Sequence, residues 1–313
     1  MIFAGLFITD RCNLRCKMCD YWKRKSDKNY LTPTQWRQVL NKLGVTRVHI
    51  IGMEPLLYKD FDVLLKSISK PGRTIMLTTN GLLLEKHLSA IHRYVHNTAV
   101  SLDGLPEVHD SIRGVPGTFN KAFNSLVKLK SMGSIVRVSF AVTPDNTHQI
   151  IPLYLKLWKH RIPMIINQFN FIHPDSCNGY NCKPSNLDKY DPRNINLDEL
   201  YEAVIHCKHA TFYPALNTMK ELKKYYRDIP IKRHVRKSCP VLENTVNGKR
   251  YAIKANGDFT PPGRYWRFDK MGNALKMDMV PEDTKWMIEF NNDIKKNGLP
   301  PPCQRLCCAG KVL

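Results

Sequence analysis

Three cysteines stand close together near the start of the chain, in the stretch TDRCNLRCKMCDYW. Cys12, Cys16 and Cys19 are separated by three and then two residues. Thiolates are soft ligands that bind iron, and one short loop carrying three of them can wrap an iron–sulfur cube. The spacing differs from the paired C-x2-C pattern usual in structural zinc sites, so zinc or simple burial is the less favoured alternative.

No fourth cysteine stands beside this triplet. A four-iron cluster held by these thiolates alone would keep one iron without a protein ligand. That iron would be open to a small molecule, by the same logic that leaves a catalytic zinc one open position. We therefore expect a cluster that binds a ligand, in contrast to a closed structural site.

Alternating strands and helices are expected to position the triplet. Apolar, β-branched runs predict strands at residues 2–9, 46–52, 74–78, 98–102, 135–143 and 164–171. Segments with helical periodicity lie between them, which is typical of parallel βα units. Such units have right-handed crossovers and carry their sites at the carboxyl ends of the strands. The first 175 residues therefore predict an α/β sheet that curls toward a barrel or a doubly wound form.

After this first strand, CNLRCKMC resembles the signature of the radical S-adenosylmethionine (SAM) superfamily. The resemblance implies that the three cysteines hold a [4Fe–4S] cluster, and that the amino and carboxylate groups of SAM bind its fourth iron. One electron, from a donor such as flavodoxin or ferredoxin, would cleave SAM to methionine and a 5′-deoxyadenosyl radical. That radical would abstract a hydrogen atom from the substrate. The implied fold is a partial (β/α)6 barrel.

Further motifs resemble the SAM-binding machinery of this family, in order, at successive strand ends. IIGMEPLL resembles the family's Gly-Gly-Glu-Pro, which cradles the SAM amino group, with Met53 in place of a glycine. Ser101 of SLDG resembles a ribose contact, and Arg113 of HDSIRG resembles an arginine that pairs with the SAM carboxylate. The expected SAM contacts are Met18, Gly52, Glu54, Pro55, Thr79, Asn80, Ser101 and Arg113.

The run SLDGLPEVHDSIRGVPGTFNKA looks most like a subgroup with a C-terminal cluster domain, called SPASM or, when shortened, Twitch. We accordingly divide the chain into a barrel core at 1–175, a loop and helical extension at 176–237, and a Twitch-like module at 238–313. Within the module, AIKANGDFTPPG predicts a hairpin with an Asn-Gly turn. Pro262 stands where the subgroup normally has a cysteine.

The remaining cysteines fall into two groups. An auxiliary iron–sulfur cluster is expected on Cys239, Cys303, Cys307 and Cys308, because a module with little core gains stability from a metal. A zinc site or plain burial is the alternative. Cys177 and Cys182 lie in a polar, turn-rich stretch, where a thiol could return a hydrogen atom to a substrate radical. Loop cysteines without a role are commoner. Cys207 is expected to pack within a helix.

Composition limits the other possibilities. The chain has 313 residues, 43% of them apolar, and no run of about 18 apolar residues that would predict a membrane span. No signal peptide is evident, so a cytoplasmic location is expected, and ten cysteines there indicate metal binding or catalysis before disulfides. The net charge is +21, densest at 220–237 with eight Lys or Arg against two acids. This segment is either a solvated helix end or a surface for an anionic partner.

Two classes of function remain. The first is a radical SAM enzyme acting on a peptide or on a small polar, anionic molecule. The chain reaches its first strand at once, so the leader-binding domain with which peptide-modifying members often begin is expected to be missing or to be a separate protein. The second is a non-catalytic iron–sulfur or zinc scaffold, with RNA as one partner, although no nucleic-acid motif accompanies the basic segment. The SAM-binding motifs favour the enzyme, since a scaffold would need only the cysteines.

Overall fold

The structure is a computed structural model that describes residues 1–19, 21–23, 29–167, 192–213, 215–227, 250–260 and 296. Six cysteines with predicted roles lie outside the described residues: Cys177, Cys182, Cys239, Cys303, Cys307 and Cys308. Their roles and the bounds of the three predicted segments therefore stay predictions. Within the described part of the chain, none of the helices is both long enough and apolar enough to cross a membrane.

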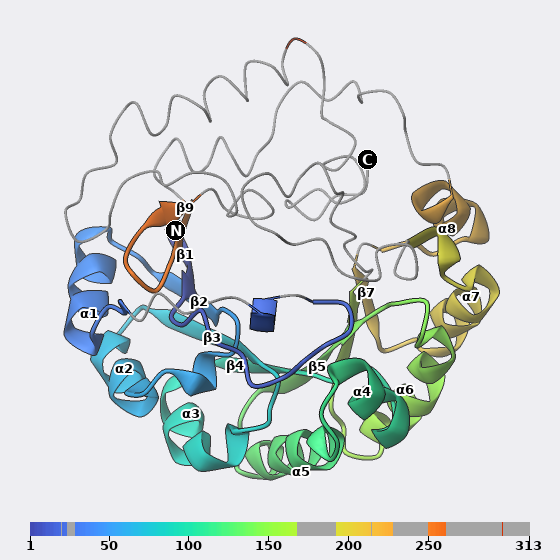
Figure 1. The fold of residues 1–313 in the computed structure, drawn as a ribbon, viewed down its shortest axis with the longest axis horizontal. Coiled ribbons are helices and arrows are strands. Elements are labelled where there is room, and N and C mark those ends of the chain that lie inside the picture. The colour runs from blue at the N-terminus through green and yellow to red at the C-terminus, as the bar shows by residue number, and fades with distance from the viewer. Residues whose placement is uncertain are drawn as a thin grey trace.

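The strands form one curved sheet of nine strands in the order β7-β6-β5-β4-β3-β2-β1-β8-β9 (Figure 1). Neighbouring strands are parallel except for β8 with β9, which are antiparallel. The strands are β1 (Phe3–Phe7), β2 (Arg47–Ile51), β3 (Thr74–Thr79), β4 (Asn97–Ser101), β5 (Val136–Ala141), β6 (Met164–Asn167), β7 (Thr211–Tyr213), β8 (Arg250–Ile253) and β9 (Phe259–Thr260). The predicted α/β partial barrel is confirmed.

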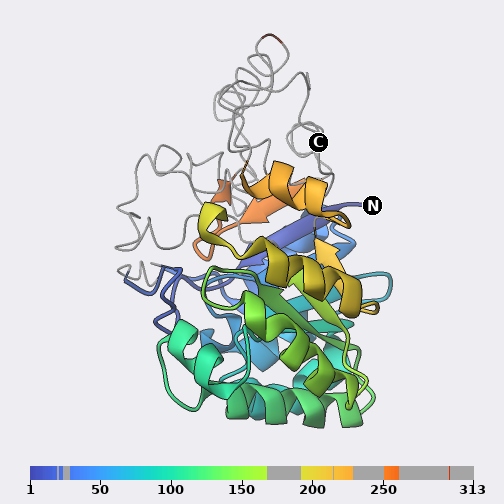
Figure 2. The same cartoon turned by 90° about the vertical axis from the view of Figure 1, so that its right-hand side faces the viewer.

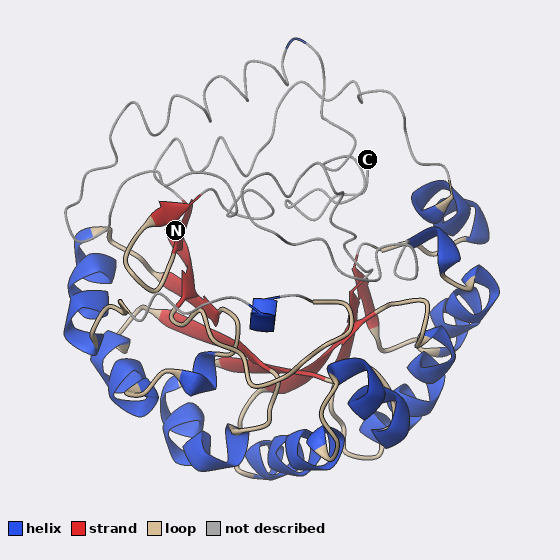
Figure 3. Ribbon diagram, in the orientation of Figure 1, coloured by secondary structure: helices blue, strands red, loops and turns tan. Residues whose placement is uncertain are grey.

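Helices connect the parallel strands and cover the convex side of the sheet (Figure 3). The α-helices are α1 (Pro33–Lys42), α2 (Phe61–Ile68), α3 (Leu88–Tyr94), α4 (Pro106–Arg113), α5 (Thr118–Ser131), α6 (Ile150–Trp158), α7 (Leu197–His206) and α8 (Met219–Tyr226). Short 3-10 helices are η1 (Tyr21–Lys23), η2 (Pro55–Leu57), η3 (Leu84–His87), η4 (Thr147–Gln149) and η6 (Pro192–Asn194). The sequence analysis assigned neither α4 nor β7.

The core lies between the sheet and this outer layer of helices. In β5 the residues are alternately buried and half-buried, because successive side chains point to opposite faces. Val138 and Phe140 belong to the same core cluster as Trp36 and Phe61, which come from helices α1 and α2. The opposite, concave face carries polar side chains, as in the hydrogen bond of 2.9 Å from Asn167 Nδ2 to Ser139 Oγ.

The predicted hairpin is present as β8 and β9, and Figure 2 shows it beside β1. Gly257 takes a left-handed φ of 88°, as the Asn-Gly turn requires. The hairpin extends the barrel sheet, because β8 pairs in parallel with β1 from Phe3 to Leu6. Ala255 of the turn accepts a hydrogen bond of 2.7 Å from the backbone N–H of Leu31. Part of the C-terminal region is thus built onto the N-terminal strand.

Candidate functional site

The cysteine triplet lies on the loop that leaves the carboxyl end of β1. Cys16 is buried, Cys12 and Cys19 are half-buried, and all three are free thiols. Burial, with smaller contributions from the charges of Cys16 and Glu54, raises the pKa of Cys12 to about 11. Burial likewise raises the pKa of Cys16. The loop therefore keeps the Cys16 thiol away from water and leaves Cys12 and Cys19 partly exposed.

The last turn of α4 holds this loop in place. The backbone N–H groups of Arg15 and Lys17 donate to the carbonyls of Arg113 and Ile112, at 3.0 and 2.8 Å. Gly114 follows the helix with a φ of 71°, and a Cβ there would lie 2.4 Å from the carbonyl oxygen of Arg15. Only glycine permits so close an approach. The loop and the end of α4 thus form one unit.

Arg113 projects from that turn to the cysteine loop. Its Nη2 lies 2.5 Å from Asp103 Oδ2, and its Nη1 donates to Cys16 Sγ at 3.9 Å. Its Nε is buried and has no hydrogen-bond partner among the described residues. Burial lowers the pKa of Arg113, but the charges of Asp103 and Cys16 outweigh burial and leave the pKa above its ordinary value. The guanidinium is a fixed positive charge beside the thiols.

Asp103 and His109 support this guanidinium. Asp103 is fully buried, and its Oδ1 accepts a hydrogen bond of 3.0 Å from the backbone N–H of Ala141. The N–H of Asp103 donates to Nδ1 of His109 at 3.1 Å. Burial, together with the charge of Arg113, lowers the pKa of His109 to about 4. The imidazole is therefore neutral at pH 7 and ties α4 to the SLDG turn.

Glu54 joins the ends of β2 and β3. Its Oε1 accepts hydrogen bonds from the Thr79 hydroxyl at 2.6 Å and from the Leu56 N–H at 3.1 Å. Its Oε2 accepts a hydrogen bond of 2.7 Å from the N–H of Asn80. Burial raises the pKa of this carboxyl, while the same hydrogen bonds lower it. A carboxylate oxygen has two lone pairs, so Oε2 keeps capacity for one more donor.

The GMEP turn tolerates a methionine where the family has a glycine. Gly52 adopts a φ of 150°, and a Cβ there would lie 3.3 Å from the carbonyl oxygen of Thr9. Among the described residues other than glycine, only Arg161 has a positive φ, so Met53 needs no left-handed backbone. The departure from Gly-Gly-Glu-Pro therefore leaves the turn unstrained at this position.

The structure brings the predicted SAM contacts to one edge of the sheet. Gly52, Glu54 and Pro55 follow β2, and Ser101 ends β4. Thr79 and Asn80 close β3, and Asn80 Nδ2 donates to Asn13 of the cysteine loop at 2.7 Å. These positions occupy the carboxyl ends of four adjacent parallel strands. Their roles toward SAM stay predictions.

The residues at this edge fit an iron–sulfur cluster and SAM. The loop offers three soft sulfur donors beside a buried positive charge. The unpartnered Nε of Arg113 is a buried donor that a ligand carboxylate would satisfy. Across the described residues, no group of three or more His, Cys, Asp or Glu is arranged to hold a metal ion. A cluster differs from such an ion because each thiolate binds a separate iron.

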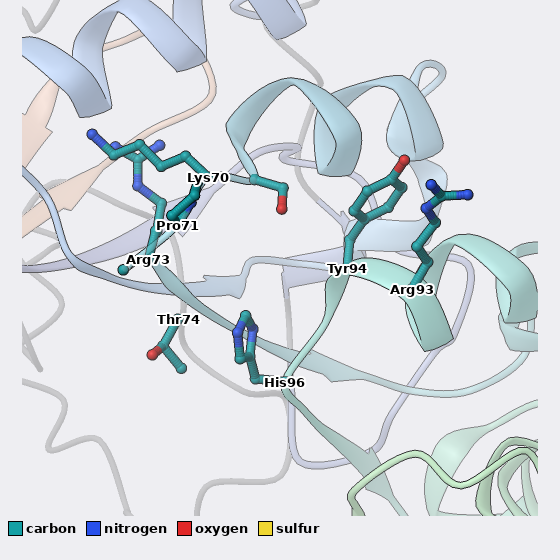
Figure 4. Close-up of a pocket in the computed structure, with 9 residues that line it drawn as sticks. Lys70, Pro71, Arg73, Thr74, Arg93, Tyr94 and His96 are labelled. Atoms are coloured by element: carbon teal, nitrogen blue, oxygen red, sulfur yellow. The ribbon is translucent and has the colours of Figure 1, made fainter.

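A cleft of about 530 Å³ opens at the opposite, amino-terminal edge of the sheet (Figure 4). Its lining includes Lys70, Arg73, Arg93 and His96, and it carries none of the predicted site residues. Arg73 donates to the carbonyls of Val45 and Ile68, and to Asn41 Oδ1, at 2.8 to 3.0 Å. These bonds join loops at the amino-terminal ends of the strands. Residues at that end of a βα barrel usually stabilise the fold, whereas the active site lies at the carboxyl end.

Sequence reasoning missed three residues that support the site. Asp103 lies within SLDG, His109 within HDSIRG, and Asn13 within the cysteine loop. Their signal was their place inside motifs assigned to other residues. Cys207 behaves as expected: it is buried in the core at the end of α7, and burial raises its pKa to about 12.

Comparison with known proteins gives an independent result. Residues 6–153 match the family model described as Radical SAM superfamily. A GTP 3′,8-cyclase of Aquifex aeolicus is 31% identical over 158 residues, which are 47% of this chain and 49% of that protein. The sporulation killing factor maturation protein SkfB of Bacillus subtilis is 29% identical over 154 residues, 48% of this chain and 38% of that protein. The chain thus matches half or less of either relative's length.

The fold has solved counterparts. SuiB of Streptococcus suis, solved bound to S-adenosylmethionine, has a TM-score of 0.64 at 20% identity and covers 94% of this chain and 67% of its own. The structure of SuiB bound to the precursor peptide SuiA has a TM-score of 0.65 at 18% identity. The match covers 94% of this chain and 66% of the SuiB chain. At these identities the likeness shows the fold alone. Together with the family match and the cysteine loop at the end of β1, it identifies residues 6–153 of this chain as a radical SAM domain.

Proposed function

We propose that this protein is a radical SAM enzyme that cleaves SAM reductively and uses the resulting 5′-deoxyadenosyl radical to abstract a hydrogen atom from its substrate. The carrying observation is the convergence at one sheet edge of the cysteine loop, the Glu54 turn and the Asp103–Arg113 pair. A scaffold would need the thiols but not a buried guanidinium with a free donor beside them.

Cys12, Cys16 and Cys19 would hold the [4Fe–4S] cluster, which when bound supplies the electron that cleaves SAM. The methionine end of SAM would lie between the free donor of Arg113 and the open lone pair of Glu54. Both groups are fixed before binding, which reduces the entropy lost on ordering them. Met18, Ser101 and Asn80 are proposed to contact the adenosine end.

The reaction balances with one external electron. An electron donor such as flavodoxin or ferredoxin would reduce the cluster, and the transferred electron would break a carbon–sulfur bond of SAM. Methionine would leave, and the 5′-deoxyadenosyl radical would take a hydrogen atom from the substrate and become 5′-deoxyadenosine. The protein's own task is to fix the reactants and exclude water.

The substrate class follows from the relatives only as a proposal. A GTP 3′,8-cyclase is similar to this chain, and SuiB, which shares its fold, was solved bound to a precursor peptide, so a small anionic molecule and a peptide are both consistent. A cytoplasmic location and a separate peptide-recognition protein remain part of the proposal. An auxiliary cluster on Cys239, Cys303, Cys307 and Cys308, and a hydrogen-atom donor at Cys177 or Cys182, also remain proposals.

Replacing Cys12, Cys16 and Cys19 together by Ala tests the enzyme directly. The variant should lose about four irons per chain relative to wild-type protein and form no 5′-deoxyadenosine with dithionite and SAM. Iron analysis and chromatography of the anaerobic reaction measure the two effects. Cys207→Ala is the matched control, since its thiol is buried in the core away from this loop. Continued SAM cleavage by the triple variant would overturn the proposal.

The auxiliary cluster needs a separate measurement. Cys239→Ala combined with Cys303→Ala should lower the iron content of the reconstituted protein by about half, leaving a single cluster signal in the EPR spectrum. If wild-type protein already holds only about four irons, the second cluster does not exist.

A further inference from the structure

Arg137 stands on the concave face of the sheet. It belongs to β5, where Val136, Val138 and Phe140 are buried in the core under the helices. Successive strand residues point to opposite faces, so Arg137 and Ser139 point to the concave side. Ser139 shares its face of the sheet with Asn167 of the neighbouring strand β6, because its hydroxyl accepts a hydrogen bond from the Asn167 side chain.

This arginine is half-buried, and the part of the chain that the structure describes gives it no partner of opposite charge. Among the described residues it makes neither an ion pair nor a hydrogen bond to a side chain, whereas Arg113 has Asp103. The segments β1 to β6 contain no Asp or Glu at all. Burial lowers the pKa of Arg137, as expected for a charge removed from water without compensation.

The neighbours of Arg137 in the sheet are small or polar. Its partner in the β4–β5 register is Ala99, and the partner of Ala99 in β3 is Thr78. The side chain of Ala99 has no charged or hydrogen-bonding group that could pair with the guanidinium. Thr78 Oγ1 and His49 Nε2 lie 2.8 Å apart, so polar groups continue across the face. A positive charge with hydrogen-bonding groups beside it favours an oxyanion.

The position relative to the SAM edge is suitable for a substrate. Ser101, the proposed ribose contact, pairs in register with Ser139 on β5. Arg137 lies two residues before Ser139, which is roughly 7 Å deeper in the concave face. A molecule whose anionic group bound Arg137 would extend upward toward the carboxyl ends of the strands, where SAM is proposed to react.

We propose that Arg137 binds a phosphate or carboxylate group of the substrate on the concave face of the partial barrel. The planar guanidinium offers paired donors that match either oxyanion. The inference rests on the proposed function, because it places this anion on the substrate of the radical reaction. Arg137 is therefore a substrate-binding residue, and its role is separate from that of Arg113 beside the cysteines.

Equilibrium dialysis of the anaerobic holoprotein with radiolabelled inorganic phosphate tests this site at fixed ionic strength. Wild-type protein should bind phosphate, and Arg137→Met should weaken binding by about ten-fold or more, as expected for a charge-assisted hydrogen bond. Arg137→Lys should recover part of the affinity, because it keeps the charge and loses the fork. Arg37→Met is the matched control, on the exposed outer side of α1.

Competition by acetate distinguishes the two sources of anion. Displacement of phosphate by acetate at comparable concentration would support an acidic side chain of a peptide, and strong preference for phosphate would support a phosphorylated small molecule. Equal phosphate binding by wild type and Arg137→Met, or an equal loss in Arg37→Met, would overturn the site. Failure of the wild-type protein to cleave SAM would instead remove the proposed reaction while leaving this result unaffected.

Discussion

Arg113 and Arg137 are both partly removed from water, but their electrostatic surroundings differ. Arg113, at the carboxyl edge, meets a buried carboxylate at 2.5 Å and a cysteine sulfur at 3.9 Å. Arg137, on the concave face, meets no carboxylate among the described residues. The pKa of the first is raised by its partners, and the pKa of the second is lowered by burial. Asp103 compensates the charge of Arg113, whereas no described acid compensates the charge of Arg137.

This contrast separates support from recognition. A buried ion pair fixes geometry, because removing either partner leaves an uncompensated charge. An uncompensated charge near a cavity is a poor stabiliser and a good binder, since a ligand can supply the missing partner. The carboxyl edge should therefore be sensitive in stability experiments, and the concave face should be sensitive in binding experiments.

Breaking the buried pair should give the largest loss of stability. Asp103→Ala leaves the guanidinium of Arg113 buried without its carboxylate and also removes the acceptor of the Ala141 N–H. We expect a loss of about 3–5 kcal/mol in the free energy of unfolding, measured by urea denaturation. A loss below about 1 kcal/mol would show that water solvates the pair in solution.

The double variant Asp103→Asn with Arg113→Met is the control for this experiment. It replaces both charges by neutral groups of similar size, so it should be more stable than Asp103→Ala. If the double variant is the less stable of the two, the loss comes from packing and not from the unpaired charge.

His109 gives the comparison a pH dependence. Its pKa is lowered to about 4 by burial and by the charge of Arg113, while Asp103 and Asp110 act in the opposite direction. The unfolded chain binds a proton near the ordinary value of 6.5, so the folded state binds fewer protons between these values. The contribution of neutral His109 to the free energy of unfolding is therefore complete above pH 6.5 and is lost as the pH falls toward 4. The loss should approach ~3 kcal/mol at the acid end.

His109→Gln removes this titration. Urea denaturation at a series of pH values should show a shallower fall in stability for the variant than for wild-type protein between pH 6.5 and 4. The variant keeps a side-chain acceptor for the N–H of Asp103. Parallel curves for the two proteins would assign the acid sensitivity to other groups.

The barrel could be predicted because its strands are short apolar runs separated by amphipathic helices. The missed elements had weak or unused signals. In α4, Pro106 opens the helix and Gly114 closes it in a left-handed conformation, which are recognised helix boundaries. The strand β7 has only three residues, too few for any periodicity. The pairing of β8 with β1 joins segments over 240 residues apart in the sequence, and no local pattern encodes it.

The candidate site was predictable where a residue type states its own chemistry. Three cysteines on one loop indicate soft-metal binding without a structure. The sequence does not show that Asp103 is fully buried against Arg113, because this contact depends on how α4 packs against the cysteine loop. Arg137 is one basic residue among 48 Lys and Arg, and only the alternation of β5 shows that it lies on the face opposite the buried Val136, Val138 and Phe140.

The smallest expected change in stability, that of Arg137→Met, tests most directly whether Arg137 differs from Arg113. Arg137→Met should change the free energy of unfolding by no more than about 0.5 kcal/mol, because the side chain is only half-buried and loses no ion pair. The methionine keeps most of the apolar stem and removes the charge from a face whose strands carry no acid. Urea denaturation beside Asp103→Ala places both values on one scale. A loss of more than about 2 kcal/mol in Arg137→Met would mean that this arginine supports the fold, because a side chain without structural partners has little stability to lose. A small change in stability together with the loss of phosphate binding would separate the two roles. Arg113 then belongs to an ion pair within the protein, and Arg137 binds the anionic group of the substrate.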